Sequence, residues 1–161
     1  MRDTYIAVVG PSAATPAEHA LGEEIGRRIA EAGAVLVCGG MGGLMEAAAS
    51  GCARAGGRSV GIVPGERASA NPYLTVAVAT GMGEGRNAIV VRTADVVIAV
   101  AGEFGTLSEI ALALKMGKPV VGLRTWEVTR PGRDADPIVR VDDPGHAVAT
   151  ALDLARSVAG R

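Results

Sequence analysis

Short apolar runs alternate with helical patterns along the whole chain, and this alternation restricts the fold more than any other feature. The runs Tyr5–Val9, Val35–Cys38 and Val96–Val100 are apolar at every position instead of alternating with polar residues. Such runs are typical of parallel strands that are buried on both faces, and strands separated by helices are the signature of βαβ units. The sequence therefore predicts an α/β fold with a mainly parallel sheet between two layers of helices.

Capping and periodicity signals define the remaining elements. Thr15, Pro16 and Glu18 form a capping box with proline at the first helical position, so we expect a helix that begins there and ends before Gly33. By the same criteria we expect further helices over residues 44–55, 87–94 and 107–116 and from Pro144 onward, and further strands over residues 59–63, 74–78, 120–123 and 138–141.

Length and charge limit the classes of protein to which the chain can belong. The 161 residues are enough for one well-buried domain, so we interpret residues 1–161 as a single domain. Acidic and basic residues nearly balance, 17 against 16, and aromatic residues make up only 2% of the chain. Because the chain has neither a basic block nor aromatic residues for base stacking, nucleic-acid binding is disfavoured.

The N-terminal apolar run and the cysteines bear on the cellular compartment. The run Tyr5–Val9 is too short for a signal-peptide core or a membrane span. We therefore expect a cytoplasmic protein that does not associate with membranes. Cys38 and Cys52 have neither the pattern of a disulfide framework nor the spacing of a metal site, so we expect two buried free thiols and no metal ligands.

Two glycine-rich turns, Gly39–Gly43 and Gly102–Thr106, each follow an apolar run and lead into a helix. Ligands of parallel α/β sheets bind at the carboxyl ends of the strands, where the free N–H groups of the next helix favour an anion. The turns therefore predict a phosphate site, although glycine is also simply what a tight turn requires. The ligand-binding residues that we predict are Gly39, Gly40, Met41, Gly42, Gly43, Gly102, Gly105, Thr106, Ser12 and Asn87.

The turns do not match the common nucleotide signatures. Neither turn ends in Gly-Lys-Ser/Thr, which argues against a P-loop triphosphate site. The first turn also lacks the third glycine of a dinucleotide fingerprint, and no acidic residue stands suitably at the end of the next strand. An enzyme that transfers hydride to a nicotinamide cofactor is therefore disfavoured.

Two segments resemble the motifs of a known family. Residues 38–46, Cys-Gly-Gly-Met-Gly-Gly-Leu-Met-Glu, and residues 101–109, Ala-Gly-Glu-Phe-Gly-Thr-Leu-Ser-Glu, are similar to segments of the Lonely Guy superfamily, whose members were formerly labelled lysine decarboxylases. The resemblance extends from the first strand to about Leu123. It implies a Rossmann-like fold and a homodimer. The plant and bacterial enzymes of the superfamily hydrolyse nucleoside 5′-monophosphates at the N-glycosidic bond, releasing the base and ribose 5-phosphate.

The resemblance also assigns roles to two residues. If the chain is a hydrolase, Glu109 corresponds to the catalytic carboxylate of the family and Arg86 to a cation near the glycosidic bond or the phosphate. However, residues 106–109, Thr-Leu-Ser-Glu, also fit a capping box in which Glu109 only accepts from a backbone N–H. Arginines on the surface are commonly just solvated, so the sequence leaves the roles of both residues open.

The chain departs from the hydrolase pattern in two segments. Residues 82–87, Met-Gly-Glu-Gly-Arg-Asn, lack the histidine and lysine of the hydrolase segment Met-His-x-Arg-Lys. In the second turn, Ala101 and Glu103 replace a proline and a glycine. These segments look closer to the branch of the superfamily that contains molybdenum cofactor carrier proteins.

Two hypotheses follow from the sequence. The first is a binding or carrier protein for a phosphate-bearing small molecule, either a nucleotide or the molybdenum cofactor. The second is a nucleoside 5′-monophosphate phosphoribohydrolase that uses Glu109 and Arg86. The sequence leaves open which molecule is bound and whether it is turned over.

Overall fold

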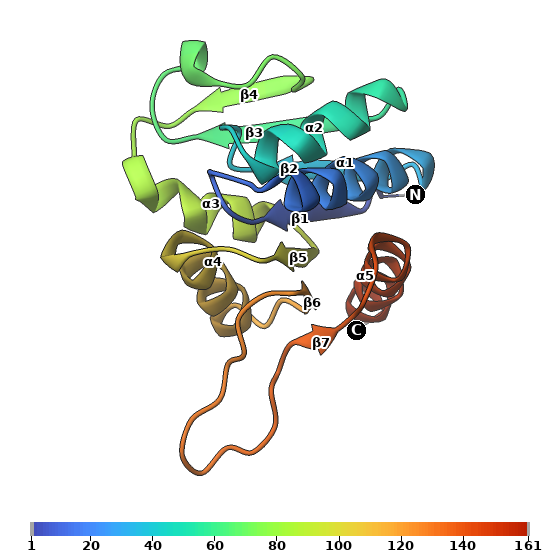
Figure 1. Cartoon of the computed structure of the whole chain (residues 1–161), viewed down its shortest axis with the longest axis vertical. Helices are drawn as coiled ribbons and strands as arrows, with labels where there is room; N and C mark the ends of the chain where they lie inside the picture. The colour runs from blue at the N-terminus through green and yellow to red at the C-terminus, as the bar shows by residue number, and fades with distance from the viewer. Residues whose placement is uncertain (1, 161) are drawn as a thin grey trace.

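Seven parallel strands form one sheet in the order β4-β3-β2-β1-β5-β6-β7 (Figure 1). The computed structural model describes residues 2–160. The chain builds the sheet outward from β1 to β4 and then returns to the other side of β1 for β5, so the direction of winding reverses between β1 and β5. The strands are β1 (Tyr5–Val9), β2 (Val35–Cys38), β3 (Arg58–Val63), β4 (Val76–Ala79), β5 (Val96–Val100), β6 (Val120–Leu123) and β7 (Val139–Arg140).

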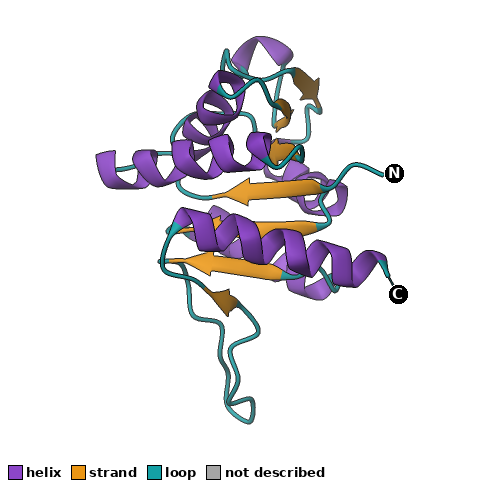
Figure 2. Ribbon diagram, turned by 90° about the vertical axis from the view of Figure 1, so that its right-hand side faces the viewer, coloured by secondary structure: helices purple, strands orange, loops and turns teal. Residues whose placement is uncertain are grey.

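Helices cover both faces of the sheet (Figure 2). On one face α1, α2 and α5 pack against the strands, with Ile25, Leu44 and Val148 in the core. On the other face α3 and α4 contribute Val90 and Ile110. The helices are α1 (Pro16–Glu31), α2 (Leu44–Arg54), α3 (Arg86–Thr93), α4 (Phe104–Lys115) and α5 (Pro144–Ala159), with short 3-10 turns η1 (Arg67–Ser69) and η2 (Gly83–Gly85).

This arrangement confirms the predicted fold class, a three-layer, Rossmann-like α/β fold with a parallel sheet. The strands β1, β2, β5 and β6 have the bounds expected from the apolar runs, because these central strands are buried at every position except the half-buried Tyr5. Residues 1 and 161, the ends of the predicted domain, lie outside the described range.

One predicted strand is displaced at the edge of the sheet. The strand expected over residues 74–78 is β4, and its pairing with β3 begins at Val76 opposite Val60. Leu74 lies before this strand, and its side chain packs over Gly61 and against the core cluster. Its apolar character therefore reflects core packing and not strand pairing. Thr75 and Ser59 then exchange bonds between side-chain hydroxyls and backbone N–H groups, of 3.0 and 3.1 Å, before the backbone pairing starts.

Both cysteines are free and buried, as predicted. Burial raises the pKa of the Cys38 thiol to about 12, so the thiolate that would react with an oxidant is suppressed. Of the helices described over residues 2–160, none has the length and apolar character needed to span a membrane.

Glycines allow α1 and α2 to approach closely. A Cβ on Gly26 of α1 would lie 1.9 Å from the carbonyl oxygen of Ala48, and a Cβ on Gly51 of α2 would lie 1.9 Å from that of Glu23. Both overlaps involve backbone atoms, which cannot rotate away as a side chain can. The distance between the two helices is therefore set by the absence of these side chains.

We predict that Gly26→Ala destabilises the protein even though alanine has the higher helix propensity. Separating α1 from α2 should lower the free energy of unfolding by about 2 kcal/mol, as overpacked cores do. Urea denaturation followed by circular dichroism measures this loss. Gly105→Ala in α4 is the matched control, since a Cβ there meets no atom within 4 Å. An unfolding free energy of Gly26→Ala equal to that of the wild type would contradict the packing argument.

Candidate functional site

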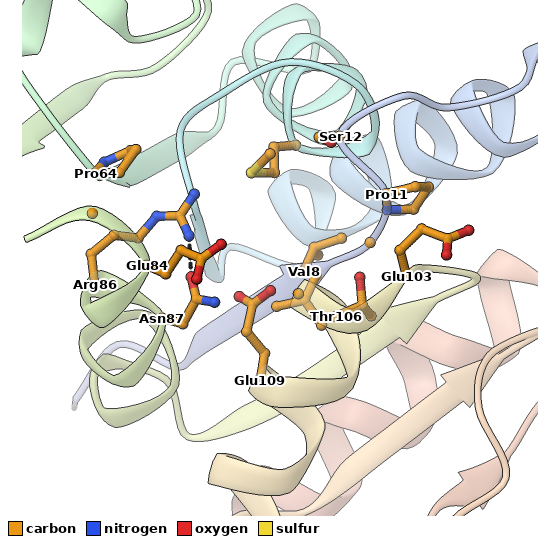
Figure 3. Close-up of a pocket in the computed structure, with 15 residues that line it drawn as sticks. Val8, Pro11, Ser12, Pro64, Glu84, Arg86, Asn87, Glu103, Thr106 and Glu109 are labelled. Atoms are coloured by element: carbon orange, nitrogen blue, oxygen red, sulfur yellow. Dashed lines mark hydrogen bonds between the residues drawn. The ribbon is translucent and has the colours of Figure 1, made fainter.

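A cavity of about 280 Å³ opens at the carboxyl ends of the strands where the winding of the sheet reverses. Val8 and Val9 of β1 and the following Ser12 form one wall. The starts of α3 and α4 provide most of the remaining wall (Figure 3). Met45 of α2 also lines the cavity. In open α/β sheets this reversal point leaves a crevice between two diverging loops, which is the usual position of a ligand.

The structure brings some of the predicted site residues into this cavity and leaves the others outside it. The predicted residues that line the cavity are Ser12, Arg86, Asn87, Gly105, Thr106 and Glu109. The predicted residues that do not line it are Gly39, Gly40, Met41, Gly42, Gly43 and Gly102.

The first glycine turn has a packing role behind the cavity wall. Gly43 has a φ of +63°, and a Cβ there would lie 2.4 Å from the Pro11 carbonyl oxygen and 2.5 Å from Ser12 backbone atoms. The neighbouring Leu44 N–H donates to the Pro11 carbonyl over 3.0 Å. The turn therefore holds the segment that carries Ser12 at the edge of the cavity. Direct binding of a phosphate by residues 39–43 stays a prediction.

The second glycine turn opens α4 directly into the cavity. The helix begins with Glu103 as its N-cap, and the Glu103 side chain makes no capping hydrogen bond. By contrast, Thr15 caps α1 and Asp143 caps α5 through their side chains. Gly105 and Thr106 in the first turn of α4 line the cavity, and within residues 2–160 no side chain accepts a hydrogen bond from their backbone N–H groups.

The start of α4 corrects the expected helix over residues 107–116. The helix spans Phe104–Lys115, so Thr106 lies inside its first turn and is not an N-cap. The capping-box interpretation of residues 106–109 is therefore wrong. The sequence pattern Thr-x-x-Glu is typical of a capping box, but the same spacing also occurs inside a helix. The pattern alone therefore does not locate the helix start. Glu109 lies in the second turn and points into the cavity (Figure 3).

Glu109 is a buried carboxylate that receives no hydrogen bond from any described residue. Glu109 is 7% exposed, and burial raises the pKa of its carboxyl to about 7. The positive charge of Arg86 acts in the opposite direction and lowers this pKa. Across residues 2–160, every side-chain oxygen or nitrogen that is fully shielded has a partner. The Glu109 oxygens therefore reach the free space of the cavity.

The guanidinium of Arg86 is fixed by the backbone at the ends of two strands. Its Nε donates to the Ile62 carbonyl over 3.0 Å, and its Nη2 donates to the Gly39 carbonyl over 3.4 Å. Its Nη1 donates to Oδ1 of Asn87, the bond drawn in Figure 3. Because a guanidinium carries five N–H groups, two remain for a ligand. Arg86 is thus a positioned cation and not a freely solvated one.

Asn87 links α3 to α4 beneath the cavity. Its Nδ2 donates to the Ser108 hydroxyl over 3.2 Å, and that hydroxyl donates to the Gly105 carbonyl over 2.7 Å. Asn87 itself is buried. The chain of bonds from Arg86 through Asn87 to Gly105 therefore fixes the cation relative to the first turn of α4.

Two further carboxylates line the cavity, Glu84 in η2 and Glu103 at the start of α4. Figure 3 shows the Glu103 carboxylate on the side of Pro11, turned away from Arg86 and Glu109. Both glutamates are exposed, so solvent screens their charge more than it screens that of Glu109. Among the described residues, no group of three or more His, Cys, Asp or Glu side chains is arranged to hold a metal ion.

Sequence reasoning missed several cavity residues. Pro64 follows β3 directly and Pro11 lies two residues after the end of β1, so their places near strand ends were a usable signal. Met45 and Glu84 gave no such signal. Their side chains reach the cavity only because α2 and η2 are folded over the same edge of the sheet.

Comparison with known proteins agrees with this architecture. The model of the SLOG cluster4 family matches residues 3–148. An uncharacterized protein of Archaeoglobus fulgidus is 41% identical over 124 residues, which cover 77% of this chain and 82% of that protein.

Two solved structures are similar over nearly their whole length. The molybdenum cofactor binding protein from Rippkaea orientalis is 34% identical, with 98% of each chain covered and a TM-score of 0.83. The molybdenum cofactor carrier protein of Chlamydomonas reinhardtii is 32% identical, with 95% of this chain and 98% of that chain covered and a TM-score of 0.85. The predicted resemblance to the Lonely Guy superfamily and to its carrier-protein branch is confirmed.

We predict that ionisation of Glu109 lowers stability as the pH rises. Because the folded-state pKa of about 7 lies above the usual 4.5, the folded protein holds more protons than the unfolded chain between these values. The free energy of unfolding should therefore fall between pH 4.5 and 7, by at most about 3 kcal/mol. Urea denaturation of wild type and Glu109→Gln across this range measures the effect, which the variant should lack.

Glu84→Gln provides the control for that measurement, because it removes an exposed carboxylate from the same cavity. Its pH profile of stability should follow the wild type. If the free energies of unfolding of wild type and Glu109→Gln changed in parallel with pH, this result would contradict the raised pKa of Glu109.

Proposed function

We propose that this chain, which belongs to the SLOG cluster4 family, is a binding or carrier protein for a phosphate-bearing small molecule, a nucleotide or the molybdenum cofactor. The similar proteins of Rippkaea orientalis and Chlamydomonas reinhardtii are named as a molybdenum cofactor binding protein and a molybdenum cofactor carrier protein. Their similarity covers almost the whole of this chain, which supports a related role.

The observation that carries this proposal is the uncapped start of α4 in the cavity. A phosphate there accepts hydrogen bonds from the backbone N–H groups of Gly105 and Thr106, which have no side-chain acceptor. The dipole of the twelve-residue helix adds an attraction for negative charge at the same point. The Ser12 hydroxyl across the cavity can donate to the same phosphate.

Arg86 offsets the negative charge that the cavity already holds. Its fixed guanidinium has two N–H groups left for the ligand, and it stands on the side of the cavity opposite Glu103 (Figure 3). Glu109 reduces the repulsion further, because a carboxyl with a pKa of about 7 is protonated in about half of the molecules at neutral pH.

A phosphoribohydrolase is the second candidate, and Glu109 is the observation that favours it. A general base or acid works best with a pKa near the operating pH, and burial brings the pKa of Glu109 to about 7. Its carboxylate and the Arg86 guanidinium also face the same cavity. Against it stand the differences from the hydrolase pattern at residues 82–87 and at Ala101 and Glu103.

We further propose a cytoplasmic homodimer that binds neither nucleic acid nor membranes. A dimer is supported by apolar side chains left exposed on the edge strand β4, where Val76 is 50% and Val78 is 40% exposed. The net charge of −1 and the lack of a basic block in the sequence argue against binding to a nucleic-acid backbone.

We predict that Gly105→Pro weakens phosphate binding while the fold is kept. Proline removes one backbone N–H, and the first turn of a helix tolerates proline because that N–H has no partner within the helix. Calorimetric titration with GMP and with inorganic phosphate should show a loss of affinity of about 10-fold, as expected for one bond to a charged group. Gly105→Ala keeps the N–H and should bind like the wild type. If Gly105→Pro and Gly105→Ala bound GMP and inorganic phosphate with equal affinity, this result would contradict binding of the phosphate at the start of α4.

A second experiment separates carrier from hydrolase. Purified protein is incubated with AMP, GMP, CMP and UMP, and ribose 5-phosphate is assayed beside Glu109→Gln. A carrier releases no ribose 5-phosphate from any of them. Release by the wild type that disappears in the folded variant would instead establish the hydrolase.

A further inference from the structure

Phosphate binding does not account for the presence of the Glu109 carboxylate in the cavity. An ionised carboxylate repels a phosphate, and in a buried position it needs hydrogen-bond donors to offset the loss of water. The residue is 7% exposed and receives no hydrogen bond from the described part of the protein. A ligand with N–H or O–H groups is therefore the available source of donors.

The hydrogen bonds of the neighbouring polar side chains go to groups other than Glu109. The Asn87 amide donates to the Ser108 hydroxyl, and this hydroxyl donates to the Gly105 carbonyl. Arg86 is held by two carbonyl groups and by Asn87, and no salt bridge within 4 Å joins it to Glu109 in residues 2–160. The carboxylate thus stays open towards the cavity.

The cavity around the carboxylate offers apolar contacts to a planar ring. Val8 and Val9 of β1, Met45 of α2 and Pro64 after β3 are among the residues that line it. Figure 3 shows the Glu109 and Arg86 side chains pointing into this cavity. A planar heterocycle suits such a site when its faces contact apolar groups and its polar edge meets the carboxylate.

We propose that Glu109 determines ligand specificity by accepting two parallel hydrogen bonds from the edge of a 2-amino-4-oxopyrimidine ring. This ring occurs in guanine and in pterins, and it presents a ring N–H beside an exocyclic amino group. The two oxygens of a carboxylate match this pair of donors, as they match the paired N–H groups of arginine. The inference rests on the proposed function, because it concerns the heterocycle attached to the bound phosphate.

The proposal discriminates among common bases. Hypoxanthine keeps the ring N–H but lacks the amino group, and the corresponding edge of adenine places an acceptor beside its amino donor. A ribose diol could also donate to the carboxylate, but every nucleoside monophosphate carries it. Preference for GMP over IMP therefore separates recognition of the heterocycle from recognition of the sugar.

The protonation state of Glu109 provides a second test of this proposal. A protonated carboxyl no longer offers two acceptors, so recognition of the ring edge requires the ionised form of Glu109. The carboxyl pKa of about 7 means that the empty cavity changes between the two forms near neutral pH. The preference for GMP over IMP should therefore decline from pH 7.5 to pH 5.5. The titration of the phosphate cancels in this ratio because both ligands carry it.

The test is calorimetric titration of the full chain with GMP, IMP and AMP at pH 7.5. We expect GMP to bind at least 10-fold more tightly than IMP or AMP, since a site that hydrogen-bonds a donor rejects an analogue without it. Glu109→Gln should bring GMP and IMP to within about 2-fold of each other, because an amide offers one acceptor and one donor. Glu84→Gln, which removes an exposed carboxylate from the same cavity, should keep the 10-fold preference.

The outcomes separate this inference from the function on which it rests. Equal binding of GMP, IMP and AMP would overturn the role of Glu109 and leave the phosphate-binding function intact. No binding of any of the three would overturn the inference together with the nucleotide alternative of the proposed function, leaving the molybdenum cofactor as its ligand. A preference for GMP that survives in Glu109→Gln would assign specificity to another residue. If the variant does not fold, a wild-type GMP/IMP ratio that stays constant from pH 7.5 to 5.5 overturns the inference.

Discussion

The parallel pairing of β1 with β5 is the interaction on which the rest of the structure depends. Ile6 pairs with Val96 and Val9 with Ala99, so both strands end at the same edge. The chain then leaves β1 towards one half of the sheet and β5 towards the other, which separates the two following loops. The cavity, the start of α4 and the segment of Ser12 all follow from this one reversal.

The candidate site keeps polar groups that have no partner in residues 2–160. The outer helices α1 and α5 have side-chain caps, whereas α2, α3 and α4 begin without one. Within residues 2–160 Glu109 likewise receives no hydrogen bond, although every fully shielded polar side-chain atom there has a partner. Such open groups cost stability in the empty protein and give binding energy to a ligand that satisfies them.

Prediction from the sequence was most accurate where burial is complete. The strands β1, β2, β5 and β6 were placed residue by residue, because continuous apolar runs are typical of central parallel strands. It was least accurate at the second glycine turn, where the segment 102–106 was read as a loop although α4 already begins at Phe104. Glycine and a capping pattern are local signals, and the same letters fit the first turn of a helix.

The sequence by itself determined the α/β fold, the family and the edge of the sheet at which a ligand would bind, because hydrophobic patterning and strand-end turns are local properties. Tertiary structure decided which residues meet there. The glycines of 39–43 pack behind the wall, while Met45 and Glu84 reach the cavity from other elements. The open state of Glu109 was decided in the same way, since burial and the absence of a donor depend on neighbours that are distant in the chain.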